Sequence, residues 1–109
     1  MAVSFVLKLD PGTLENPDLD LRYAVPNAIV QASPGTLQGT GYSYDEHFNC
    51  ILIFISGRDE HDLKTIVRVL ETEQFLDNDL RATPVGIIEK KIARVVHPPS
   101  QVGTTFNVP

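Results

Sequence analysis

The amino-acid sequence predicts an α+β domain in which a single, mainly antiparallel sheet carries two helices on one face. Residues 3–9 place Phe5, Leu7 and Leu9 on one face, with the period of two that marks a strand. Residues 50–55 are continuously apolar, as expected of a strand buried on both faces. Residues 63–70 place apolar side chains at i, i+3, i+4 and i+7, which is the pattern of an amphipathic helix.

Residues 19–33 are the most ambiguous stretch, because their apolar side chains fit both an alternating strand and a helical stripe. Pro26 favours a helix that starts close to it, since proline suits a first helical turn and costs about 3 kcal/mol in a helix interior. We therefore expect a short helix from about Ala24 or Pro26 to Ser33. The alternative is an earlier start at the cap signal of Asn16, with a kink at Pro26.

The remaining segments complete the sheet. Turn residues at 10–12 end the first strand. Residues 36–44 contain two glycines and predict an irregular edge strand with a bulge. Residues 82–89 and 92–97 predict two further strands. Residues 1–97 then form one domain, and residues 98–109 an extended or mobile C-terminal tail.

The resulting order is strand, helix, strand, strand, helix, strand, strand. It resembles the ferredoxin-like β-α-β-β-α-β arrangement with an additional C-terminal strand. Right-handed crossovers would pack both helices on one face of the sheet. Because folds of this kind host many unrelated functions, the resemblance implies a scaffold and no particular activity.

The predicted topology also suggests where polar residues gather. We expect the first and third strands to run parallel, which would bring Asp10 and its acidic loop to the same end of the sheet as residues 59–62 and the 89–91 turn. His47 and His97 would lie at the opposite end, near the acidic residues Asp77 and Asp79. Tyr42 and Tyr44 share one face of their strand, and cross-strand packing is their expected role.

The tripeptide Asp-Glu-His occurs twice, at residues 45–47 and 59–61. Carboxylates beside an imidazole are typical of metal sites and of acid–base sites. The strand between the two copies would separate them by about 26 Å, whereas metal ligands lie within about 2–2.6 Å of one ion. His47 and His61 are therefore not expected to share a site. The second copy fits a helix N-terminus, where acidic side chains cap free amides.

Composition and motifs exclude several functions. The net charge of −5 argues against nucleic-acid binding, which needs a basic surface. The chain contains no apolar run of about 20 residues and no signal-peptide pattern at its N-terminus, so we expect no membrane span and a cytoplasmic location. The single Cys50 is expected to be a small buried residue. No phosphate-binding loop, dinucleotide fingerprint, nucleophile elbow or zinc-protease motif is present, so we expect no cofactor, no metal and no catalysis.

These observations predict a non-catalytic protein-binding module, for example a toxin-neutralising (immunity-type) or regulatory protein. An acidic surface would attract a basic protein partner. The residues predicted to form it are Asp10, Glu15, Asp18, Asp59, Glu60 and Asp62. The alternative is a small-ligand sensor domain of a ferredoxin-like dimer, and the third class is a small enzyme that uses His47 or His97. The sequence is compatible with a monomer or a homodimer.

Overall fold

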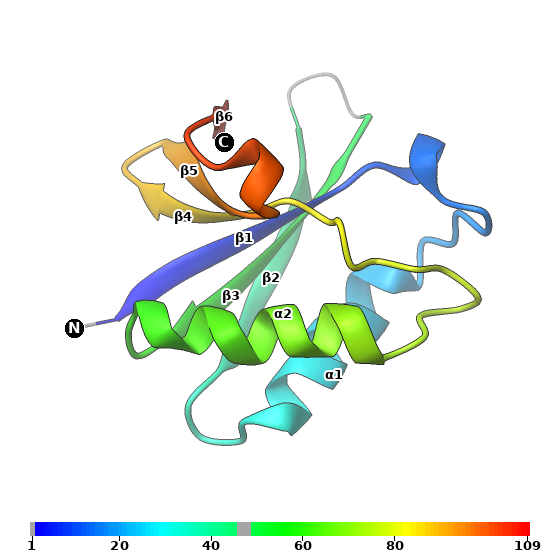
Figure 1. Ribbon diagram of the computed structural model, residues 1–109, viewed down its shortest axis with the longest axis horizontal. Helices are drawn as coiled ribbons and strands as arrows, with labels where there is room; N and C mark the ends of the chain where they lie inside the picture. Colours follow the sequence, from blue (N-terminus) through cyan, green and yellow to red (C-terminus); the bar gives the residue numbers. More distant parts are fainter. Residues whose placement is uncertain (1, 46–48) are drawn as a thin grey trace.

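The computed structural model describes residues 2–45 and 49–109. It confirms the α+β class, with two helices against one sheet (Figure 1). The sheet order is β2-β3-β1-β4-β5-β6, and every neighbouring pair is antiparallel. The helices and strands are β1 (Val3–Leu9), α1 (Leu21–Ala32), β2 (Gln38–Tyr44), β3 (Ile51–Gly57), α2 (Leu63–Thr72), β4 (Val85–Glu89), β5 (Ile92–His97) and β6 (Thr105–Asn107).

The main core lies between the sheet and the two helices. Alternate side chains of β1 and β3 point toward the helices, as the period of two requires. The helices face them with apolar stripes at helical spacing. The buried residues on this side include Phe5, Leu7, Leu9, Leu21, Val25, Ile29, Ile51, Ile53, Ile55, Ile66, Val69 and Leu70.

Helix α1 begins earlier than the preferred prediction, and Pro26 lies in its interior. A turn ahead of the helix sets this start, because Leu21 N–H donates to the Asp18 carbonyl at 3.1 Å. Proline in this position costs about 3 kcal/mol. Leu21 and Val25 are fully buried, at about 1.5–3 kcal/mol each, which at least offsets that cost. Tertiary burial therefore extends the helix through a residue that local propensity would exclude.

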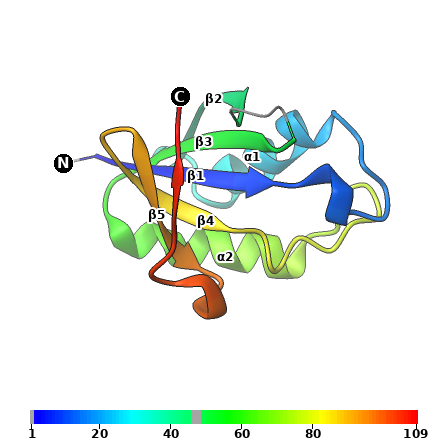
Figure 2. The same ribbon diagram turned by 90° about the horizontal axis from the view of Figure 1, so that it is seen from above.

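The helix-free face of the sheet is covered in part by the C-terminal segment. Residues 98–109, expected to be an extended or mobile tail, contain a 3₁₀ turn (η3, Pro99–Gln101) and β6. Strand β6 pairs with β5 and crosses in front of the central strands (Figure 2). Phe106 and Val108 then pack in the cluster that buries Val6 and Leu52 completely. The C-terminal segment is thus part of the sheet, beyond the boundary predicted at residue 97.

Strand β2 forms one edge of the sheet, as predicted. Its pairing with β3 shifts register between Gly39 and Gly41, which is the expected bulge. Gly41 has φ +124°, a backbone conformation that favours glycine. Within the described ranges, none of the helices has the length and apolar character that crossing a membrane requires.

Candidate functional site

The six carboxylates expected to form one acidic surface lie at two opposite ends of the sheet. Strands β1 and β3 are antiparallel, with Val3 opposite Gly57 and Leu9 opposite Ile51. The expectation of parallel strands was therefore wrong. The crossover through α1 returns β2 parallel to β1, and the following hairpin reverses the chain again into β3. Asp10 consequently adjoins the start of β3, whereas Asp59 follows its end.

The acidic residues at the Asp59 end are engaged in local structure. Asp59 Oδ1 accepts the His61 N–H at 2.8 Å, and Asp62 Oδ2 accepts the N–H groups of Arg58 and Asp59 at 2.6 and 3.2 Å. This is a reciprocal capping box over the 3₁₀ turn η2 (Glu60–Asp62) that leads into α2. The second Asp-Glu-His copy is therefore a helix cap, as predicted.

Arg94 joins this end of the sheet to the 89–91 turn, which lies here as expected. Its side chain donates from Nη2 to Glu60 Oε1 at 3.5 Å and from Nε to Glu89 Oε1 at 3.2 Å. All three side chains are largely exposed, so these ion pairs contribute little to stability. The carboxylate of Glu60 is already partly neutralised, which weakens it as an attractor for a basic partner.

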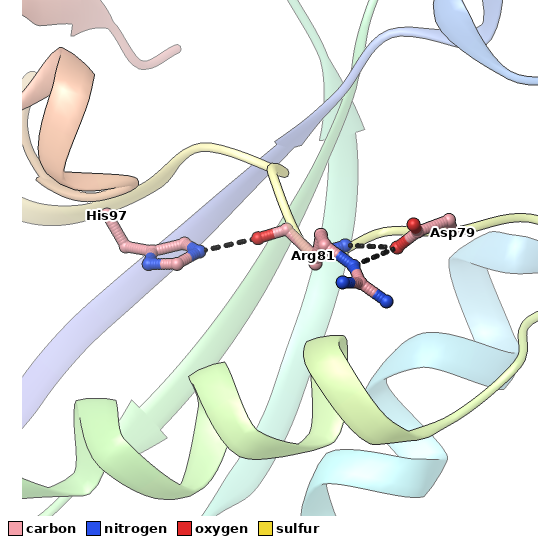
Figure 3. A network of polar contacts seen from close by, with 3 residues as sticks. All are labelled: Asp79, Arg81 and His97. Carbon is pink, nitrogen blue, oxygen red and sulfur yellow. Dashed lines mark hydrogen bonds and ion pairs between the residues drawn. The ribbon is translucent and has the colours of Figure 1, made fainter.

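The opposite end contains Asp10, Asp18 and a polar network around Arg81. Asp79 Oδ1 accepts both the backbone N–H and the Nε–H of Arg81, and the Arg81 carbonyl lies 2.7 Å from His97 Nε2 (Figure 3). His97 lies near Asp79, as predicted, but at the same end of the sheet as Asp10, from which the prediction had separated it. The hydrogen bonds from Arg81 lower the pKa of the Asp79 carboxyl. Glu46 and His47 of the first Asp-Glu-His copy lie outside the described residues.

A cluster of three tyrosine rings and one guanidinium lies where the first turn of α1 meets the end of β2. The rings of Tyr23 and Tyr42 are edge-to-face, with centroids 5.8 Å apart, and the rings of Tyr42 and Tyr44 are edge-to-face at 6.2 Å. The guanidinium carbon of Arg22 lies 4.8 Å from the Tyr23 centroid and 5.1 Å from that of Tyr42. We call Arg22, Tyr23, Tyr42 and Tyr44, together with the exposed Leu19 that precedes the helix, the tyrosine patch.

The tyrosine patch combines exposure with internal order. Leu19, Tyr23 and Tyr42 are 57%, 49% and 40% exposed, which is high for large apolar side chains. The hydrogen-bonding contact between the two hydroxyls lowers the pKa of Tyr23 and raises that of Tyr42, and the positive charge of Arg22 also lowers the pKa of Tyr23. The patch is therefore an arranged set of side chains at the surface.

Carboxylates flank the tyrosine patch on one side. Asp18 and Asp20 precede α1, and the charge of Asp20 is close enough to Tyr23 to oppose ionisation of its hydroxyl. Asp18 Oδ1 accepts the Asp20 N–H at 2.9 Å, whereas the Asp20 side chain makes no capping hydrogen bond. Of the six predicted partner-binding residues, only Asp18 adjoins the patch directly along the chain.

Sequence reasoning paired Tyr42 and Tyr44 with strand packing but missed Leu19 and Tyr23. The spacing of the apolar residues does indicate that these two side chains are exposed. If the helix starts before residue 21, then Leu19 and Tyr23 fall off the buried stripe that begins at Leu21 and must face outward. The prediction that the helix begins near Pro26 hid this pattern, because it left both residues in a loop.

Metal and thiol chemistry have little structural support. Across residues 2–45 and 49–109, no three His, Cys, Asp or Glu side chains gather closely enough to hold a metal ion. Cys50 is 7% exposed, in agreement with its expected role as a buried residue. Burial raises the pKa of the Cys50 thiol, and the neighbouring Asp10 and Asp45 add to the effect.

The tyrosine patch and its acidic flank are the strongest candidate for a functional surface. Comparisons with protein-family models, with curated proteins and with solved structures find no match to the chain.

Proposed function

We propose that the protein is a non-catalytic protein-binding module that binds a basic protein partner through the tyrosine patch and its acidic flank. The observation that carries the proposal is the exposure of Tyr23 and Tyr42, whose rings are packed edge-to-face between α1 and the edge strand β2, with the exposed Leu19 nearby in the chain. Tyrosine and arginine are the residue types enriched at the energetic centres of protein interfaces. A toxin-neutralising or other regulatory protein needs an exposed surface of this kind to hold its partner.

The internal contacts of the patch support tight binding. Edge-to-face packing holds Tyr42 against both Tyr23 and Tyr44, and the guanidinium of Arg22 stacks near two of these rings. Side chains that are already ordered lose little conformational entropy when a partner covers them. The Nε atom of Arg22 is buried and has no hydrogen-bond partner among the described residues, so Arg22 serves to position the rings.

The neighbouring strand shapes how a partner can approach. Residues 38–42 of β2 are exposed, and β2 has a neighbour on one side only. An exposed edge can accept a partner strand, but a bulge interrupts continuous pairing. The shift of register between Gly39 and Gly41 lies directly beside Tyr42. We therefore assign the binding energy to the side chains of the patch rather than to strand addition.

Charge identifies the class of partner. The chain has a net charge of −5, and the acidic flank of the patch is formed by Asp18 and Asp20. Carboxylates at the rim of an interface accelerate association with a positively charged partner and contribute less to the lifetime of the complex. A basic protein is thus the complementary occupant. Asp59, Glu60 and Asp62 lie at the other end of the sheet and are not part of the proposed surface.

The proposal can be tested with a photo-crosslinking amino acid at the exposed Thr40 of β2. The captured protein is purified, and its affinity for the wild type is compared with that for Tyr42→Ala. A matched control is Val102→Ala, since Val102 is 58% exposed and lies at the end of η3. We expect Tyr42→Ala to weaken binding about 30-fold or more, as for an interface hot spot of at least about 2 kcal/mol, and the control to have no effect.

A second pair of variants tests the electrostatic part. Asp20→Asn removes a flank charge without removing a capping hydrogen bond, and Glu71→Gln removes an exposed charge from α2. The association rate constant should fall for Asp20→Asn and should depend less steeply on salt, whereas Glu71→Gln should match the wild type. A partner that binds Tyr42→Ala as tightly as the wild type would remove the proposal.

A further inference from the structure

A second feature of the molecule is a cavity of about 560 Å³ at the end of β1 where Asp10 lies. Its lining comes from the end of β1, residues 82–84 before β4, and residues 101–106 of the C-terminal segment. The half-buried Leu14 and Phe106 supply apolar surface, whereas Leu9 and Val95 are almost fully buried. Cavities of this size that combine apolar walls with a few polar groups are typical of small-molecule sites. The cavity is independent of the tyrosine patch, none of whose residues lines it.

Among the residues that the structure describes, Lys8 is the only basic side chain that lines the cavity. It lies opposite Leu52 in the sheet and shares the helix-free face with Val6. Its Nζ lies 5.1 Å from the centroid of the Phe106 ring. No ion pair among the described residues involves Lys8. The cavity therefore presents an ammonium group that no carboxylate of the described chain neutralises.

The carboxylates at the cavity are already engaged. Asp79 accepts two hydrogen bonds from Arg81, and Asp10 Oδ1 accepts the Gly12 N–H at 2.9 Å. Their negative charges remain close to the cavity and oppose a ligand with several negative charges. Thr83, which is 7% exposed, adds a hydroxyl to the lining. The lining thus combines one cation that is unpaired within the described chain, apolar side chains and two carboxylates that already accept hydrogen bonds, so an anion with an apolar body fits only if it carries a single charge.

We propose that this cavity binds a small organic monocarboxylate, with the carboxylate against the Lys8 ammonium and the apolar body against Phe106 and Leu14. This site gives the alternative function of a small-ligand sensor a location, and it does not depend on the protein-binding proposal. The C-terminal segment forms one of its walls, so ligand binding should also stabilise the packing of β6.

The test is a nuclear magnetic resonance titration with 4-methylpentanoate at millimolar concentration. The neutral 4-methylpentanamide and inorganic phosphate serve as matched probes. The carboxylate should cause saturable shifts of the backbone amides of Lys8, Thr83 and Thr105, which line the cavity. The amide should bind at least about tenfold more weakly than the carboxylate, because it loses a charge-assisted contact. Phosphate should give no saturable shift. Equal affinity for carboxylate and amide, or no saturable shift with any probe, would overturn the proposal.

Two variants locate the site. Lys8→Met removes the charge and keeps the backbone hydrogen bond from Lys8 N–H to the Pro84 carbonyl, and Lys64→Met is its matched control on the exposed face of α2. Lys8→Met should weaken binding at least about tenfold, and the control should bind normally. Ala82→Phe blocks the cavity from an exposed position, so a folded spectrum with no binding is expected. Unchanged affinity in Ala82→Phe would contradict the proposed location.

Discussion

The capping box at Asp59 and Asp62 allows a quantitative test of whether the second Asp-Glu-His copy is structural. Asp62→Ala removes the acceptor of two backbone N–H groups, at 2.6 and 3.2 Å, and leaves the start of α2 without its reciprocal cap. Gly57 lies close by, since a Cβ there would be 2.8 Å from Asp62 Oδ2. The Asp62 carboxylate therefore lies against the backbone of Gly57, and a side chain at residue 57 would displace it.

The expected loss follows from typical capping energies. Removal of an N-cap acceptor costs about 1 kcal/mol, with a range of about 0.5–2, and a carboxylate near a helix N-terminus adds about 0.3–1 kcal/mol from the dipole. Because Asp62 accepts two bonds, we expect Asp62→Ala to lower the free energy of unfolding by about 1.5–2 kcal/mol. Asp62→Asn keeps an acceptor oxygen and should lose about 0.5 kcal/mol. For a domain of this size, 1 kcal/mol corresponds to about 4–8 °C in Tm.

The assay is urea unfolding followed by circular dichroism, with Asp59→Ala and the double variant completing a cycle. The sum of the losses in free energy of unfolding for the two single variants should exceed the loss for the double variant. Each carboxylate caps a backbone that the other carboxylate helps to hold in place. Association with the partner should be unchanged in Asp62→Asn. If Asp62→Ala were as stable as the wild type, or if Asp62→Asn abolished partner binding, the structural assignment of these acids would be wrong.

Two further predictions concern Cys50 and the C-terminal segment. Burial raises the pKa of the Cys50 thiol in the folded protein, so this thiol ionises at lower pH in the unfolded chain. The neutral thiol's contribution to the free energy of unfolding is therefore fully present below about pH 8.5. It is lost as the pH rises through the pKa of the folded protein. Unfolding at pH 7 and pH 10 should therefore show a steeper alkaline loss for the wild type than for Cys50→Ala. Phe106→Ala opens the cover over Val6 and Leu52 and should cost about 2 kcal/mol, less than the about 3–5 kcal/mol of a fully buried phenylalanine, since Phe106 is half-buried. An unchanged urea midpoint for Phe106→Ala would mean that β6 does not stabilise the sheet.

Local periodicity was sufficient to predict the elements that bury one continuous face. The alternation of β1, the apolar run of β3 and the helical stripe of α2 all appear in the structure close to their expected bounds. The preferred start of α1 was less accurate, because the decisive contribution was burial of Leu21 and Val25 rather than the local preference of Pro26. Strand β6 has only three residues, and pairing with β5 accounts for it better than any pattern of its own.

The six acidic residues do not gather at one end of the sheet, for a reason of chain direction. The expectation that they meet depended on β1 and β3 being parallel, whereas they are antiparallel. Predicting the tyrosine patch would have required the correct start of α1. Predicting the cavity would have required knowing that the C-terminal segment is ordered. Both sites therefore combine segments distant in sequence, which local periodicity does not bring together.

Hydrogen–deuterium exchange with and without the purified basic partner tests the central claim most directly. The protein-binding account predicts slower exchange in residues 19–24 and 38–44, which contain the tyrosine patch, and no change in the capping box at residues 58–62. Protection confined to residues 58–62, with the tyrosine patch exchanging as in the free protein, would contradict the account.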